Sequence, residues 1–154
     1  MIRPATLNDL EQINVIRKQV NDLHVNGEPE IFKSGFPLDM QDYAKTFIDS
    51  DTKQLFVVEN NGFICAFAMA EIIIKPETPY TFEQKYVDIK ELGTDEKCQG
   101  KGYGKQLINA VKEYAKQHNI KRVQLNVWTF NKGALSFYDK TGFNTYRKYL
   151  RLDV

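Results

Sequence analysis

The feature that most constrains the fold is a glycine-rich segment between a strand-like run and a helix-like run. The segment reads Gln99-Gly100-Lys101-Gly102-Tyr103-Gly104. β-Branched and aromatic residues mark 82–92 before it, and apolar residues recur at helical spacing over 107–115 after it. Glycine lets a backbone approach a ligand closely, and N–H groups at a helix start bind phosphate oxygens. The pattern predicts a phosphate-binding loop, although a plain strand-to-helix turn can carry the same glycines.

Two other kinds of phosphate loop do not fit this segment. A Walker A loop needs glycine at position 99 and serine or threonine at position 106, and both positions hold glutamine. The dinucleotide-binding pattern needs a third small residue where Lys105 stands. The sequence therefore excludes a P-loop nucleotide site and a Rossmann dinucleotide site.

The rest of the chain alternates between helical and extended patterns. The expected elements, in chain order, are a short N-terminal strand, helices over 6–23 and 40–48, strands over 55–58, 63–74 and 82–92, a helix over 102–119, a strand over 122–128, a helix over 132–140 and a final strand or hairpin over 143–152. Asn60-Asn61-Gly62 supplies the positive φ angles of a tight hairpin. This order predicts an α/β fold with a mixed, mostly antiparallel sheet and helices on both faces. Ligands are expected beyond the carboxyl ends of 82–92 and 122–128.

Composition limits the class of protein. The 154 residues suit a single domain, 1–154, and the 21 Lys and Arg against 20 Asp and Glu give no sign of a nucleic-acid-binding surface. No apolar stretch reaches membrane-span length and no signal peptide is recognised, so a cytoplasmic location is expected. Cys65 and Cys98 lack metal-type spacing and are interpreted as reduced thiols, so no metal site is expected. A nucleophilic Cys98 is the alternative.

Two motifs resemble those of the GNAT superfamily of acyl-CoA-dependent N-acetyltransferases. The family's phosphate loop reads Gln or Arg, two residues, Gly, one residue, Gly or Ala, and Gln99, Gly102 and Gly104 fit it. The second motif is Asn-Lys-Gly-Ala-Leu-Ser-Phe-Tyr-Asp-Lys-Thr-Gly-Phe at 131–143. The two motifs stand in the family's order, and the order of elements extends the resemblance over nearly the whole chain. A GNAT-like acyl-CoA-binding fold is therefore expected.

The resemblance implies a site for acetyl-CoA as acyl donor. In the family, the strand before the loop splays from its neighbour and pairs with the pantetheine arm, and the loop holds the pyrophosphate. The positions implied to bind acetyl-CoA are Leu92, Gly93, Thr94, Gln99, Gly100, Lys101, Gly102, Tyr103, Gly104, Lys105, Asn131, Ala134 and Phe137. Gly93 and Thr94 depart from the bulky aliphatic residues usual there. Lys101 and Lys105 either add charge near phosphates or are solvated, and Asn131 contacts pantetheine, caps a helix, or does both.

The chemistry needs a way to remove a proton, because a typical alkyl ammonium has a pKa around 10 and only the free amine attacks a thioester. Asp88 is the first candidate base, since some relatives carry a carboxylate there, and Glu91 is the rival; either can instead be an ordinary solvated carboxylate. Strand alternation places them on opposite faces unless a bulge intervenes. The resemblance implies that Tyr138 protonates the departing thiolate, and simple aromatic packing is the alternative.

The long irregular loop of residues 24–34 is the expected source of acceptor specificity. His24 lines the amine pocket or lies on the surface, and Glu28 and Glu30 hint at a cationic substrate or simply meet water. Trp128, followed closely by Phe130, ends a strand beside the expected cleft, where aromatic residues form either a substrate wall or part of the core.

The leading hypothesis is transfer of acetyl from acetyl-CoA to a primary amine of a small molecule, by direct attack in a ternary complex. A protein or peptide N-acetyltransferase and a non-catalytic acyl-CoA-binding regulatory module are the alternatives. Retention of Tyr138 and two carboxylates favours catalysis over the binding module. No nucleic-acid or membrane partner is expected, and the resemblance allows a homodimer.

Overall fold

The computed structural model describes all of residues 1–154. The strands are β1 (Ile2–Pro4), β2 (Lys53–Asn60), β3 (Phe63–Lys75), β4 (Gln84–Thr94) and β5 (Val123–Leu125). The helices are α1 (Leu10–Gly27), α2 (Leu38–Tyr43), α3 (Tyr103–Gln117) and α4 (Lys132–Lys140), with short 3-10 turns at Leu7–Asp9, Ala44–Phe47 and Glu96–Cys98. The sheet order is β1-β2-β3-β4-β5, and only the β4–β5 pair is parallel.

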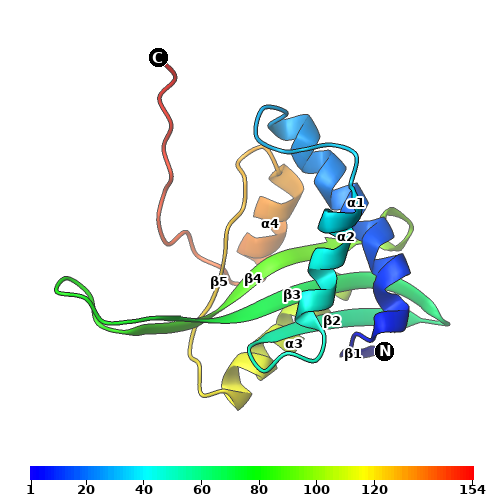
Figure 1. The fold of residues 1–154 in the computed structure, drawn as a ribbon, viewed down its shortest axis with the longest axis horizontal. Helices are drawn as coiled ribbons and strands as arrows, with labels where there is room; N and C mark the ends of the chain where they lie inside the picture. Colours follow the sequence, from blue (N-terminus) through cyan, green and yellow to red (C-terminus); the bar gives the residue numbers. More distant parts are fainter.

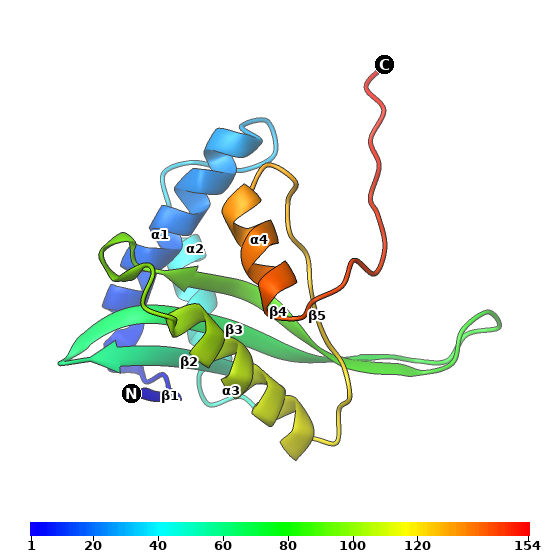
Figure 2. The same cartoon turned by 180° about the vertical axis from the view of Figure 1, so that it is seen from behind.

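Helices cover both faces of this sheet. α1 and α2 lie on one face and α3 on the other (Figures 1 and 2). Phe67 and Met69 of β3 are buried in the cluster that includes the apolar stripe of α1. Ala66, Ala68 and Ala70 alternate with them and are buried in the cluster that includes α3. The structure thus confirms the predicted α/β fold with a mostly antiparallel sheet and helices on both faces.

The β2–β3 hairpin forms where the sequence predicts it. Asn61 and Gly62 have φ angles of 52° and 79°. Positive φ at both central residues matches the turn to the right-handed twist of the two strands. The hairpin register runs from Lys53 opposite Glu71 to Asn60 opposite Phe63.

Three predicted elements differ most from the structure. The helix predicted over 40–48 is divided into α2 and a 3-10 turn. The strand predicted over 122–128 shortens to β5, because only three of its residues pair with β4. The final strand predicted over 143–152 does not form, and residues 143–154 contain no helix or strand. Extended residues make a strand only when a neighbouring strand pairs with their backbone groups, and none lies beside this segment.

A β-bulge interrupts β4 near its middle. The register with β3 shifts where Met69 lies opposite Glu91 and Ala70 lies opposite Ile89, so Lys90 is the extra residue. Beyond this point β4 continues to Thr94, whereas β5 pairs only with residues 87–89. Residues 90–94 of β4 therefore have a free edge on the side of β5.

Two segments project from the body of the molecule. The β3–β4 hairpin extends beyond the ends of β2 and β5, and residues 144–154, here named the C-terminal arm, lead away after α4 (Figures 1 and 2). None of the helices combines the length and apolarity needed to cross a membrane.

Candidate active site

The loop between β4 and α3 presents unpaired backbone donors. Gly100 and Gly102 have φ angles of 77° and 79°, left-handed values that favour glycine, and Gly102 is the N-cap of α3. None of the backbone N–H groups of residues 99–105 donates to a backbone acceptor in the protein. Successive free N–H groups at a helix start form an anion-binding concavity. The loop therefore has the donors that a pyrophosphate requires.

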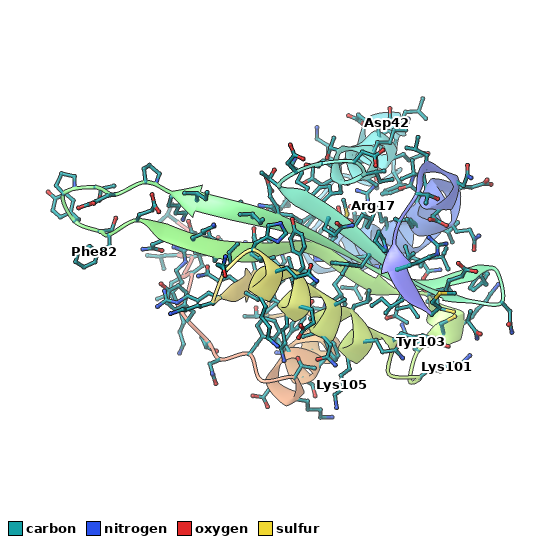
Figure 3. The ribbon with its side chains drawn as sticks, turned by 90° about the horizontal axis from the view of Figure 1, so that it is seen from below. Arg17, Asp42, Phe82, Lys101, Tyr103 and Lys105 are labelled. Atoms are coloured by element: carbon teal, nitrogen blue, oxygen red, sulfur yellow. The ribbon has the colours of Figure 1, made fainter.

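The two sequence motifs meet at this loop. A Cβ atom on Gly104 would lie 2.9 Å from Cζ of Phe137, so α4 packs closely against the start of α3 and a side chain at position 104 would require the Phe137 ring to shift. Lys101 and Lys105 are exposed, and Figure 3 shows them with Tyr103 around the first turn of α3. The arrangement places basic side chains on the outside of the loop and aromatic packing on its inside.

The carboxyl end of β4 lies directly beneath α1. A Cβ atom on Gly93 would lie 2.8 Å from Cγ2 of Val20 and 3.0 Å from the ring of Phe67. This crowding leaves little room for a side chain at position 93, which explains the glycine there. Leu92 packs on the opposite side, against the cluster beneath α3, and Leu92, Gly93 and Thr94 all lie on the free edge of β4.

Asp88 and Glu91 point to the same face of the sheet. Regular strand alternation predicted opposite faces, and the bulge at Lys90 is the reason for the difference. Asp88 lies opposite Glu71 and Glu91 lies opposite Met69, and residues two apart on β3 share a face. The Nζ atom of Lys90 lies 2.8 Å from Oδ2 of Asp88 and 3.4 Å from Glu71.

Both carboxylate oxygens of Glu91 are bound by Arg17 of α1. The Nε–Oε2 distance is 2.8 Å and the Nη2–Oε1 distance is 2.9 Å. Arg17 is buried, and its Nη1 also donates to the carbonyl of Met40 at 2.7 Å and to Oδ1 of Asn14 at 3.0 Å. The ring centroid of Phe36 lies 5.3 Å from the guanidinium carbon. Arg17 thus joins α1, the segment through α2 and the bulged part of β4.

Arg17 was not among the residues that the sequence predicted. It stands four positions after Ile13 and one after Ile16, both fully buried on the stripe of α1 that faces the sheet. A charged residue at such a position is rare unless it is paired. The charged residue on the buried stripe was therefore the sequence signal for Arg17. Its partner Glu91 lies 74 residues away, so no local sequence pattern indicates the pair.

Tyr138 is held by α4 among aromatic side chains. The Asn131 side chain caps this helix by accepting from the N–H of Ala134 at 3.1 Å, which confirms its predicted capping role. The Tyr138 ring lies 5.3 Å from that of Phe137 and 5.5 Å from that of Phe143. Burial raises the pKa of Tyr138 to about 12. The phenol therefore stays protonated at neutral pH.

Four rings at the end of α1 form what we name the aromatic cluster: His24, Phe32, Trp128 and Phe130. His24 lies 4.9 Å from Phe32 and 5.8 Å from Phe130, and Trp128 lies 5.3 Å from Phe32 and 6.0 Å from Phe130, centroid to centroid. Nδ1 of His24 lies 2.8 Å from the carbonyl of Val20. Because a carbonyl only accepts, Nδ1 carries the proton and Nε2 is the free nitrogen. Phe32, an aromatic in the irregular loop, was missed by sequence reasoning.

The acidic residues of the same loop do not join this cluster. Glu28 accepts from Arg151 of the C-terminal arm at 3.2 and 3.3 Å. Glu30 is exposed. An exposed ion pair of this kind contributes little to stability, so Glu28 can exchange its partner readily.

Other parts of the chain do not add to this site. Cys65 and Cys98 are buried free thiols, and burial raises the pKa of Cys98 to about 11, which argues against a nucleophile. Two surface hollows lie at the start of β4 and beside the end of α3, where Tyr86, Ile120 and Arg122 are among their lining residues. Neither hollow contains a predicted site residue, and the loop chemistry lies at the other end of β4.

Comparison with known sequences gives one family. Residues 18–143 match the family model described as Acetyltransferase (GNAT) family. The chain is 34% identical over 103 residues to an uncharacterised N-acetyltransferase, MJ1207, of Methanocaldococcus jannaschii. The matched region covers 66% of this chain and 43% of that protein. It is 35% identical over 69 residues to an uncharacterised N-acetyltransferase, YycN, of Bacillus subtilis, covering 45% of this chain and 42% of that protein. The chain thus spans less than half the length of these relatives.

Solved structures share the whole fold. A mutant of the BH1408 protein from Bacillus halodurans has a TM-score of 0.95 at 26% identity, covering 100% of this chain and 99% of that chain. The structure of AAC(6')-Iy with a CoA-based bisubstrate analogue has a TM-score of 0.78 at 18% identity, covering 100% and 97%, which shows a common fold alone. Because the first superposition covers the entire chain, it includes the C-terminal arm.

Proposed function

The chain belongs to the GNAT family of acetyltransferases, and from that premise we propose that it transfers the acetyl group of acetyl-CoA to a primary amine of a small molecule. The amine attacks the thioester directly, in a ternary complex of protein, acetyl-CoA and amine. The observation that carries the proposal is the meeting of the unpaired N–H groups of 99–105 with the free edge of β4 and with α4.

In this proposal acetyl-CoA lies against the free edge of β4. Its pyrophosphate accepts hydrogen bonds from the N–H groups of 99–105, and Lys101 and Lys105 add positive charge. Its pantetheine amides pair with the backbone of 92–94, as an added strand pairs with a sheet edge. The α4 side, from Asn131 through Ala134 to Phe137, closes over it. Because this pairing uses backbone groups alone, a glycine at position 93 can bind the pantetheine arm without a side chain.

The reaction forms a C–N bond and breaks a C–S bond. The amine nitrogen attacks the carbonyl carbon and gives up a proton, and the departing sulfur takes one. Tyr138 is the proposed donor to sulfur, supported by a phenol that burial keeps protonated. Asp88 is the preferred base, because Lys90 contacts one of its oxygens, whereas Arg17 holds both oxygens of Glu91. Glu91 is then a rival base only if Arg17 releases it.

The acceptor side of the proposed site is the face of the sheet that carries α1 and α2. Asp88 points to this face. The aromatic cluster offers an apolar wall with one free imidazole nitrogen, Nε2 of His24. Glu28 and Glu30, on the same loop, attract a cationic acceptor. This combination supports a small amine with an apolar or ring-shaped body, and AAC(6')-Iy, an aminoglycoside N-acetyltransferase with the same fold, makes amino sugars a sensible first class to test.

The test is a panel of amines with acetyl-CoA, in which released CoA thiol is detected. Polyamines, aminoglycosides, amino acids and peptide N-termini represent the acceptor classes. We expect thiol release with at least one small amine, and a large loss of rate in Asp88→Asn. Release with peptides alone contradicts the small-molecule acceptor. Binding of acetyl-CoA without release for any amine contradicts catalysis and leaves the acyl-CoA-binding module.

A further inference from the structure

The side chain of Gln19 connects α1 to the turn that precedes Gln99–Gly104, a segment here named the glycine loop. Oε1 of Gln19 accepts from the N–H of Glu96 at 3.2 Å, and Nε2 donates to Oδ2 of Asp95 at 3.2 Å. Gln19 is half-buried, and Asp95 is 3% exposed. Because one amide uses both its acceptor and its donor on neighbouring residues, it fixes the position and the orientation of the turn relative to α1.

The carboxylate and backbone of Asp95 continue this contact into the turn. Oδ1 of Asp95 accepts from the N–H of Lys97 at 2.9 Å, and its carbonyl accepts from the N–H of Cys98 at 2.8 Å. The N–H of Asp95 donates to the carbonyl of Cys65 on β3 at 2.9 Å. The turn is therefore held from two sides, by β3 and by Gln19, immediately before the glycine loop begins.

The glycine loop itself has no such support. None of the backbone N–H groups of residues 99–105 donates to a backbone acceptor. The course of the loop is therefore set at its two ends, by the turn on one side and by α3 on the other. Glycine loses more conformational freedom on ordering than any other residue. Since ordering a loop on binding costs affinity, the turn decides how much ordering is left for the ligand to cause.

The same stretch of α1 also lies against the edge of β4 that leads into the loop. Arg17 binds Glu91, and Val20 lies close to Gly93. Gln19 then binds the turn beyond the end of the strand. The ribbon between β4 and α3 passes beside α1 in both views (Figures 1 and 2). One side of α1 thus supports both the strand edge and the loop on which acetyl-CoA is proposed to lie.

We propose that Gln19 is a positioning residue for acetyl-CoA, an inference that rests on the proposed function. Gln19 holds the turn so that the N–H groups of the glycine loop are aimed at the pyrophosphate before the ligand arrives. It acts through Asp95 and Glu96 and not by binding the ligand itself. Loss of its two hydrogen bonds leaves the sheet and α3 in place but frees the loop at one end.

Gln12 provides a matched control, because it forms the same pair of hydrogen bonds from the same helix to a different segment. Oε1 of Gln12 accepts from the N–H of Ile64 at 2.9 Å, and Nε2 donates to the carbonyl of Gly62 at 3.3 Å. Both bonds reach the β2–β3 hairpin and neither reaches the glycine loop. Gln12→Met and Gln19→Met each remove two hydrogen bonds from α1 and keep the length of the side chain. A difference in their ligand affinity therefore reports on the loop and not on a general loss of stability.

The test is calorimetric titration of acetyl-CoA into the parent, Gln19→Met and Gln12→Met, with urea unfolding of all three. We expect Gln19→Met to raise the Kd about tenfold, because the loop must then be ordered on binding, and Gln12→Met to change it less than about twofold. Similar losses of stability are expected in the two variants. Equal Kd values in the two variants overturn the positioning role and leave the proposed function standing. A parent that does not bind acetyl-CoA contradicts the proposed function, and the positioning role with it.

NMR relaxation of the backbone amides, measured without ligand, tests the mechanism. Order parameters of residues 99–104 are expected to fall in Gln19→Met and to keep their parental values in Gln12→Met. Parental order parameters in Gln19→Met overturn the proposal even if acetyl-CoA affinity falls, because Gln19 then acts by another route.

Discussion

Replacing Glu91 with Gln is expected to lower the free energy of unfolding by about 2 to 3 kcal/mol, because it removes the charge that faces a buried guanidinium. Arg17 has 4% of its side chain exposed and Glu91 has 26%. Breaking a fully buried pair costs about 3 to 5 kcal/mol. The value for Glu91→Gln is smaller because water reaches this side chain and the amide oxygen still accepts one of the two N–H groups. For a domain of this size, the change lowers Tm by roughly 5 to 10 °C.

The double variant Arg17→Met with Glu91→Leu is the control, because it removes both charges and leaves neither of them unpaired. Its free energy of unfolding is expected to lie within about 1 kcal/mol of the parent value. Urea unfolding, followed by circular dichroism and by the fluorescence of Trp128, measures all three proteins. A free energy of unfolding for Glu91→Gln within about 0.5 kcal/mol of the parent value refutes the argument from a buried Arg17–Glu91 ion pair. A double variant no more stable than Glu91→Gln refutes it as well.

Three further predictions concern other residues. Tyr138→Phe is expected to lower kcat about a hundredfold while calorimetry finds acetyl-CoA affinity unchanged; equal losses of binding and stability indicate packing instead. The hydrogen bond from Arg3 holds the pKa of Asp9 at about 2, below its ordinary 3.8, so this stabilisation is complete above about pH 4 and is lost as pH falls through about 2. Urea unfolding from pH 5 to 2 should show a loss of about 2 kcal/mol that Asp9→Asn lacks, and parallel curves contradict this. Gly93→Ala is expected to destabilise by about 1 to 3 kcal/mol through its contact with Val20, whereas Gly133→Ala, with open space, should not; equal stabilities count against the crowding.

The sequence predicted the parts of the fold that local chemistry determines. Asn61-Gly62 fixes a hairpin because both residues tolerate positive φ. Gly102 begins α3 and Asn131 caps α4 for similarly local reasons. Helical spacing of apolar residues identified α1 and α3. The glycines of 99–104 stand between β4 and α3, as the sequence indicated, and phosphate binding at this loop stays a prediction.

Features that depend on distant partners could not be predicted in this way. The bulge at Lys90 adds one residue to β4 without any turn signal, and it alone brings Asp88 and Glu91 to one face. The hydrogen bonds of Arg17 join it to Met40 and Glu91, which lie far from it in sequence. Residues 143–152 are rich in aromatic and apolar side chains, but a strand forms only where another strand pairs with it, and no strand of this chain pairs with this segment.

Calorimetric titration of acetyl-CoA into the parent, Gly102→Asn and Gly102→Asp tests the central claim most directly. Asn and Asp have the same shape and both tolerate the left-handed conformation at position 102, so the pair differs mainly in charge. If the N–H groups of 99–105 hold the pyrophosphate, Asp should weaken binding at least about tenfold more than Asn, through repulsion of the phosphates. Equal affinity of the two folded variants would contradict the loop assignment and, with it, the placement of acetyl-CoA along β4.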